Sequence, residues 1–233
     1  MSIRTKKRGQ LIIISGTTCA GKGTIIKRLL ENNPNMELSI SYTSRPIRGG
    51  EIDGVDYYFV TQEEFERKIA SGDFLEYAQV HYGKYYGTPK KELEEKLASG
   101  KDVILEIEVQ GAAQVKELFP ETILIFILAP SMEEVKRRIK ARGVENNEQI
   151  VKRFEKAYRE INEINKYNYV VVNDVLEDAV LKVESILISE KCRVDRIEEI
   201  SVENQEEIIH EFLMDKEFDN SVTNLLNSKK DAD

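Results

Sequence analysis

Short hydrophobic runs alternate along this chain with longer segments in which hydrophobic residues recur every three or four positions. The runs are nearly continuous, as in parallel strands covered on both faces, and they lie at residues 11–15, 103–109, 123–128 and 169–172. The periodic segments predict amphipathic helices at residues 24–31, 132–142 and 148–166. This alternation predicts an α/β fold, with a parallel sheet flanked by helices and a site at the carboxyl ends of the strands.

Residues 39–89 interrupt the alternation. They are rich in tyrosine and glycine and contain short alternating stretches at residues 39–43 and 56–60. This pattern predicts a small β-rich subdomain inserted into the sheet domain. We therefore expect one domain over residues 9–190 that carries this insert.

The end of the chain differs from the rest in charge. Residues 190–233 contain 13 acidic and 6 basic residues, so they hold most of the net charge of -8. Their hydrophobic positions predict one or two amphipathic helices, and residues 216–233 have the composition of a disordered segment. These positions are Ile197, Ile200, Ile208, Ile209, Phe212 and Leu213. We expect residues 191–233 to form an acidic tail, partly helical or disordered.

Composition narrows the function classes. The body of the chain has a net charge near zero and no basic stripe with interleaved aromatics, so no nucleic-acid partner is expected. Cys19 and Cys192 are far apart, which suggests neither a disulfide framework nor a zinc site and favours a reducing compartment. The hydrophobic run after the basic N-terminus is too short for a signal peptide or a membrane span. We expect a cytoplasmic protein with no membrane partner.

A glycine-rich segment directly follows the first hydrophobic run. It reads Gly16-Thr17-Thr18-Cys19-Ala20-Gly21-Lys22-Gly23-Thr24. Glycines let backbone N–H groups approach phosphate oxygens, the following helix presents its N-terminus, and Lys22 adds a mobile positive charge. The segment is nearly a Walker A loop, but Gly23 replaces the usual Ser or Thr, which moves the hydroxyl to Thr24. The pattern predicts a nucleoside triphosphate site, with a glycine turn that binds nothing as the weaker alternative.

Glu106 and Glu108 lie two positions apart in the predicted strand at residues 103–109. The period of two places both on one face, and a strand this hydrophobic is expected to be interior. Buried carboxylates need cations or hydrogen bonds. Near the carboxyl end of a strand beside a phosphate loop, we expect them to hold magnesium through water and to accept hydrogen bonds from a bound base.

Several separated motifs resemble those of the guanylate kinase family, in the family's order and over residues 10–190. They are Gly21-Lys22-Gly23-Thr24, Ser44-Arg45-Pro46-Ile47-Arg48, Tyr86-Gly87-Thr88-Pro89, the run from Leu105 to Ala112, Arg138, Arg142-Gly143 and Asn173-Asp174. The resemblance implies a P-loop NTPase-type sheet, an inserted GMP-binding subdomain at residues 39–89 and a helical lid at residues 135–155. It also implies phosphorylation of GMP, and by extension of dGMP, by ATP in purine nucleotide metabolism.

On this resemblance, GMP is bound mainly by the insert. The residues assigned to it are Ser41, Arg45, Arg48, Tyr57, Glu76, Tyr86, Thr88 and Glu108. Two guanidinium groups in an extended, proline-containing segment can clamp a phosphate dianion. Carboxylates and hydroxyls suit the N1–H and N2–H2 donors of guanine. The alternatives are a solvated arginine pair, tyrosines with ordinary packing roles and a Glu76 that faces solvent.

The resemblance assigns ATP binding to the glycine-rich segment together with Asn173. Catalytic roles fall on Lys22, Arg45, Arg138, Arg142 and Arg153. Phosphoryl transfer depends on positioning and positive charge, so no histidine base is required. The alternative for the lid arginines is a charged solvent face. Mg²⁺ is expected to be held by phosphates and water, with no direct protein ligand.

Two departures from the family pattern fall within these motifs. Cys19 stands where the family commonly has glycine, and Glu108 stands where it usually has aspartate. We expect an ATP:GMP phosphotransferase. The rival hypotheses are a guanylate-kinase-like binding module without catalysis and a kinase for another monophosphate.

Overall fold

The computed structural model describes residues 2–5, 8–80, 83–141 and 147–201. These residues separate into two compact units. Residues 8–190 form the larger unit, and residues 2–5 with residues 191–201 form the smaller one.

A five-stranded parallel sheet is the centre of the larger unit, with the strand order β10-β9-β2-β8-β3. The strands are β2 (Leu11–Gly16), β3 (Met36–Leu38), β8 (Asp102–Leu105), β9 (Ile123–Leu128) and β10 (Tyr169–Val172). The predicted parallel sheet is therefore confirmed. The strand expected at residues 103–109 is too long, because pairing with β2 stops at Leu105 and a helix begins at Val109.

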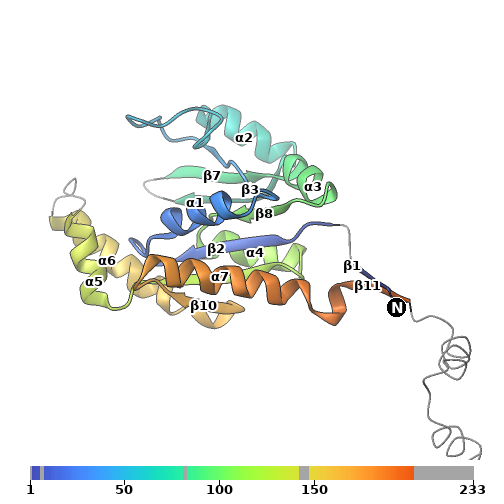
Figure 1. Cartoon of the computed structure of the whole chain (residues 1–233). Helices are drawn as coiled ribbons and strands as arrows, with labels where there is room; N and C mark the ends of the chain where they lie inside the picture. The colour runs from blue at the N-terminus through green and yellow to red at the C-terminus, as the bar shows by residue number, and fades with distance from the viewer. Residues whose placement is uncertain (1, 6–7, 81–82, 142–146, 202–233) are drawn as a thin grey trace, which may run out of the picture. The chain divides into compact units, whose positions relative to one another are not determined.

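Helices cover both faces of this sheet (Figure 1). They are α1 (Lys22–Asn32), α3 (Lys90–Ala98), α4 (Val109–Leu118) and α7 (Leu176–Lys191). Alternate residues of β2 point to opposite faces, so Ile12 and Ile14 pack with α1 and α7, while Leu11 and Ile13 pack with α3 and α4. The continuous hydrophobic run of β2 thus supplies two cores at once.

The β-rich insert is present, and it also contains a helix. Its four-stranded sheet has the order β5-β4-β7-β6 and is accompanied by α2. The elements are β4 (Tyr42–Thr43), β5 (Tyr58–Phe59), α2 (Gln62–Ala70), β6 (Phe74–Val80) and β7 (Lys84–Pro89). Phe65 of α2 is fully buried and stacks on Phe74 and Tyr85, with ring centroids 4.5 and 5.1 Å away. An aromatic stack therefore replaces a larger aliphatic core in this small subdomain.

Two helices, α5 (Met132–Ala141) and α6 (Asn147–Ile161), occupy the region of the expected lid. They pack through Val135, Ile139 and Ala157, and Cys19 of the glycine-rich loop lies against this cluster. The helix predicted over residues 148–166 ends at Ile161 and is followed by a short 3-10 turn, η1 (Ile164–Lys166).

The smaller unit is a two-stranded antiparallel sheet of β1 (Ser2–Thr5) and β11 (Ile197–Ser201), preceded by η2 (Val194–Arg196). The prediction of a helix at Ile197 and Ile200 is wrong, since strand pairing with the N-terminus overrides the helical spacing. The other positions of that prediction, from Ile208 to Leu213, lie outside the described residues. Within the described ranges, every helix is too short or too polar to cross a bilayer.

Candidate active site

The glycine-rich loop joins β2 to α1 at the carboxyl edge of the parallel sheet. Lys22 opens α1, and its Nζ donates to the carbonyls of Gly16 at 2.9 Å and Thr17 at 3.4 Å. Gly21 has a φ of 89°, and a Cβ there would lie 2.4 Å from Nδ2 of Asn173. The loop therefore curls around its own lysine, and glycine is required where the loop meets Asn173.

Cys19 adopts a left-handed conformation, with a φ of 63°. Glycine adopts this conformation without strain, whereas it costs a residue with a side chain about 1 to 2 kcal/mol. Contacts with Val135 and Ile139 accompany it. The loop therefore accommodates cysteine in a left-handed conformation, with its side chain against the packed helices α5 and α6.

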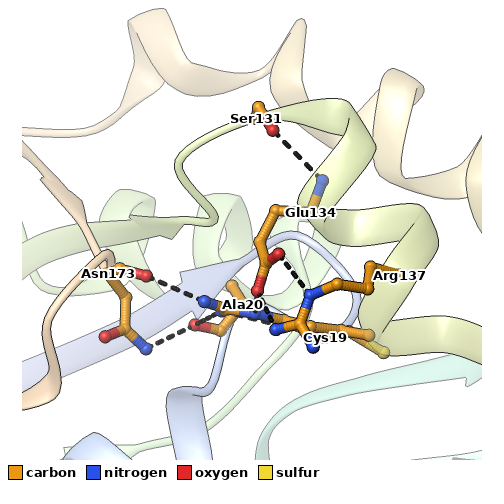
Figure 2. A network of polar contacts seen from close by, with 7 residues as sticks. Cys19, Ala20, Ser131, Glu134, Arg137 and Asn173 are labelled. Atoms are coloured by element: carbon orange, nitrogen blue, oxygen red, sulfur yellow. Dashed lines mark hydrogen bonds and ion pairs between the residues drawn. The ribbon is translucent and has the colours of Figure 1, made fainter. Parts of the chain in front are cut away.

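A polar network ties α5 and the residues after β10 to the back of the loop (Figure 2). Asn173 is buried and donates its Nδ2 hydrogen to the Ala20 carbonyl at 2.7 Å. Arg138 donates to the Asn173 carbonyl at 3.2 Å and to the Cys19 carbonyl at 3.4 Å. Glu134 accepts from Arg138 and Arg137, and these guanidinium groups lower its pKa to about 2. In this conformation Arg138 supports the loop's backbone.

A second network reaches the loop from α6. Glu160 is 4% exposed and accepts from the backbone N–H of Thr18 at 3.1 Å. Lys156, one helical turn earlier, lies 3.6 Å from Glu160 and donates to Glu108 at 2.9 Å. Burial, followed by the nearby Glu108, raises the pKa of Glu160 to about 7. Lys156 thus lies between one carboxylate that holds the loop and another beside the expected guanine site.

The structure corrects the placement of Glu106 and Glu108. They are not on a buried strand but on the connection between β8 and α4, where Glu108 is the residue before the helix. Glu106 is exposed, and Glu108 is half-buried. Desolvation raises the pKa of Glu106, and the ammonium of Lys22 opposes this shift. The connection therefore brings carboxylates to the loop's lysine at the sheet edge.

The carboxylates of Glu106 and Glu108 are compatible with the expected Mg²⁺, held through phosphates and water. Among the residues that the structure describes, no group of three His, Cys, Asp or Glu side chains could hold a metal ion. Glu106 lies near Lys22 and near Glu108, and this pair of carboxylates suits Mg²⁺ kept partly hydrated rather than a closed protein cage.

On the insert, Arg45 is held firmly in place. Its guanidinium donates to both carboxylate oxygens of Glu51, at 2.7 and 2.5 Å, and its Nε donates to the Tyr86 hydroxyl at 3.1 Å. It also lies over the Tyr57 ring, 5.0 Å from the centroid. The Arg45 guanidinium lowers the pKa of Glu51 to about 2, and the Glu51 carboxylate in turn raises the pKa of Arg45. The backbone N–H of exposed Arg48 donates to the same carboxylate at 2.8 Å.

The structure therefore brings Arg45, Tyr57 and Tyr86 together and places Arg48 next to them. Glu51 organises this group, and sequence reasoning missed its role. The spacing from Arg45 to Glu51 carries no recognisable signal, because the turn that joins them forms only in the fold.

A buried polar pair lies on the paired strands β6 and β7. Glu76 is 5% exposed, and its Oε1 accepts from the Thr88 hydroxyl at 2.7 Å, directly across the strands. Burial raises the pKa of Glu76. The alternative, in which Glu76 faces solvent, is therefore wrong. Ser41 is half-buried just before β4 in the same subdomain.

Arg142 and Arg153 are the remaining residues for which the sequence predicts a catalytic role. Arg142 lies outside the described residues. Arg153 lies half-buried on α6. Glu160 and Lys156 were not predicted, because their i,i+4 spacing is common on helices and only the packing of α6 brings them to the loop.

Comparison with known proteins is consistent across three measures. A family model described as guanylate kinase matches residues 8–190. A guanylate kinase from Clostridium perfringens is 55% identical over 213 residues, which cover 91% of this chain and 98% of that protein. One from Clostridium tetani is 57% identical over 209 residues, or 90% of this chain and 100% of that protein. A crystal structure of guanylate kinase from Anaplasma phagocytophilum matches with a TM-score of 0.70 and 34% identity, covering 83% of this chain and 92% of that one.

Proposed function

We propose a role in the reaction for each site residue of this chain, which belongs to the guanylate kinase family and is an ATP:GMP phosphotransferase. The loop would bind the donor phosphates, the insert would bind the acceptor, and the two would meet at the carboxyl edge of the parallel sheet. The observation that carries the proposal is the buried Glu76–Thr88 pair, a desolvated acceptor group inside a subdomain that otherwise packs through aromatics.

On the donor side, the backbone N–H groups of the loop would face the ATP phosphates. The residues involved are Gly16, Thr17, Thr18, Cys19, Ala20, Gly21, Lys22, Gly23 and Thr24, with Asn173 supporting the turn from behind. Lys22 would leave the loop carbonyls for the β- and γ-phosphates, because a phosphate carries more charge than a carbonyl.

On the acceptor side, Arg45 and Arg48 would clamp the GMP phosphate with the hydroxyls of Tyr57 and Tyr86. The Glu51 carboxylate already orients Arg45, so little side-chain freedom remains to be lost on binding. Glu76, Thr88, Ser41 and Glu108 would read the guanine edge. Their oxygens accept the N1–H and N2–H2 hydrogens that adenine does not present in the same place.

Transfer itself would depend on positive charge around the moving phosphoryl group. Lys22 and the lid arginines Arg138, Arg142 and Arg153 would supply it, since charge spreads over the equatorial oxygens in the transition state. Mg²⁺, when bound, would neutralise the donor phosphates. It would be held by phosphates and water near Glu106 and Glu108. We extend the proposal to dGMP as a substrate and to a cytoplasmic location.

The division of labour is tested by two substitutions with opposite kinetic signatures. Arg48→Ala should raise the KM for GMP about tenfold or more with a smaller change in kcat, because the clamp binds the acceptor before transfer. Lys22→Ala should lower kcat by a factor of about 100 or more. Arg28→Ala removes an exposed arginine of α1 that pairs with Glu31, and it should change neither constant.

Two results would contradict the proposal. An Arg48→Ala enzyme with unchanged KM and kcat for GMP would refute the acceptor clamp. Near-normal turnover by a folded Lys22→Ala enzyme would refute the assignment of the loop.

A further inference from the structure

Gly111 lies in the first turn of α4, where it is buried. Glycine in a helix is less favourable than alanine by about 1 kcal/mol, so a buried helical glycine calls for a steric reason. That reason is Glu76. A Cβ on Gly111 would lie 2.5 Å from the Oε2 atom of Glu76 and 3.1 Å from its Cδ atom. The carboxylate therefore occupies the space that any larger residue at position 111 would take.

The carboxylate of Glu76 cannot move away freely. Its other oxygen accepts from the Thr88 hydroxyl at 2.7 Å, and the pairing of β6 with β7 fixes Thr88 directly opposite. The same helix contacts β6 at a second point, because the Gln114 side chain donates to the Tyr77 carbonyl at 3.3 Å. Glu76 is thus held between a strand of the insert and the backbone of a helix that packs on the central sheet.

We propose that Gly111 is a positioning residue for base selection, whose missing side chain sets where the Glu76 carboxylate stands. The inference rests on the proposed role of Glu76 in reading guanine. A hydrogen-bonded base edge tolerates little displacement of its acceptor, and a shift of about 1 Å can cost a factor of about 100 in rate. Selection of the base by the insert therefore depends on a residue outside the insert.

The test is the kinetics of Gly111→Ala with GMP and AMP. We expect kcat/KM for GMP to fall by a factor of about 10 to 100, mainly through KM, and kcat/KM for AMP to change little. The melting temperature should fall, because the added Cβ overlaps a carboxylate that Thr88 holds in place, and this outweighs the better helix propensity of alanine. Ala113→Gly is the control. It weakens the same helix on its exposed face, and the GMP to AMP ratio should not change.

A compensating change separates this effect from general disruption. Shortening the acid with Glu76→Asp withdraws the carboxylate by one methylene. The double variant Gly111→Ala with Glu76→Asp should therefore recover part of the kcat/KM for GMP lost in Gly111→Ala. Should Gly111→Ala fail to fold, recovery of folding in the double variant would support the contact. Failure of the double variant to recover either activity or folding would refute it.

A further variant keeps this inference distinct from the function on which it rests. Glu76→Gln should lose GMP selectivity if Glu76 reads guanine. If Glu76→Gln loses selectivity while Gly111→Ala keeps the wild-type GMP to AMP ratio, the role of Gly111 is overturned and that of Glu76 stands. If Glu76→Gln keeps the wild-type ratio, the role of Glu76 in base reading is itself overturned.

Discussion

Glu160 is the residue in which burial, charge and contact with the loop come together. It is 4% exposed, accepts from the Thr18 backbone and has its pKa raised to about 7, first by burial and then by Glu108. The Lys156 ammonium at 3.6 Å opposes that shift without cancelling it. Near neutral pH, the protonation of one carboxyl group is therefore linked to the stability of the fold around the loop.

We expect Glu160→Gln to remove a pH dependence of stability. A carboxyl whose pKa is higher in the folded than in the unfolded chain stabilises the fold below about pH 4.5, and this contribution is lost as the pH rises through about 7. Between pH 5 and pH 8, the free energy of unfolding of the variant should rise relative to that of wild type by on the order of 2 to 3 kcal/mol. Urea denaturation at both pH values measures this.

Glu155→Gln is the matched control for that experiment. It neutralises an exposed acid on the same helix, and its stability curve should run parallel to that of wild type. If the stability of Glu160→Gln also depends on pH in parallel with that of wild type, the raised pKa of Glu160 would be contradicted.

At the residue scale, the sequence predicts functional groups that act within one short motif. The glycine spacing of the loop and the position of Lys22 could be predicted because a bound phosphate requires backbone N–H donors and a positive charge in the same segment. The sequence predicts a strand through Glu106 and Glu108 because Leu105, Ile107 and Val109 continue the hydrophobic run, whereas strand pairing ends at Leu105. Glu51 and Glu160 act across turns and packed helices, so no local pattern marks them.

At the scale of elements, the aromatic stack of the insert is the clearest determinant of local stability. Phe65→Ala should lower the free energy of unfolding by about 3 to 5 kcal/mol, because a fully buried ring is lost from between Phe74 and Tyr85. Phe65→Leu keeps most of the volume and should lose clearly less. Chemical denaturation compares the two. Equal losses below about 1 kcal/mol for both variants would show that the stack does not stabilise the insert.

The elements of the central sheet could be predicted because buried parallel strands leave continuous hydrophobic runs, as in β2 and β9. β11 could not be predicted, since Ile197 and Ile200 have helical spacing and their pairing partner is about 195 residues away in the chain. Non-local pairing of this kind leaves no trace within a short sequence window.

At the scale of the whole molecule, every described site residue lies within residues 8–190, which is also the range that the family model matches. A chain limited to residues 8–190 should therefore keep the wild-type ratio of kcat/KM for GMP over AMP within about twofold. The expectation follows because the acidic segment beyond residue 190 supplies none of the proposed contacts. Loss of GMP phosphorylation in a truncated chain that remains folded by circular dichroism would place part of the site in the smaller unit.

The most direct test of the account is the rate of ADP release by the full chain with ATP, Mg²⁺ and each of GMP, AMP, UMP and CMP. If the P-loop holds the donor and the buried Glu76–Thr88 pair selects the acceptor base, kcat/KM for GMP should exceed that for each of the other three by a factor of about 100 or more. Comparable values for GMP and AMP would contradict the assignment of that pair to the recognition of guanine.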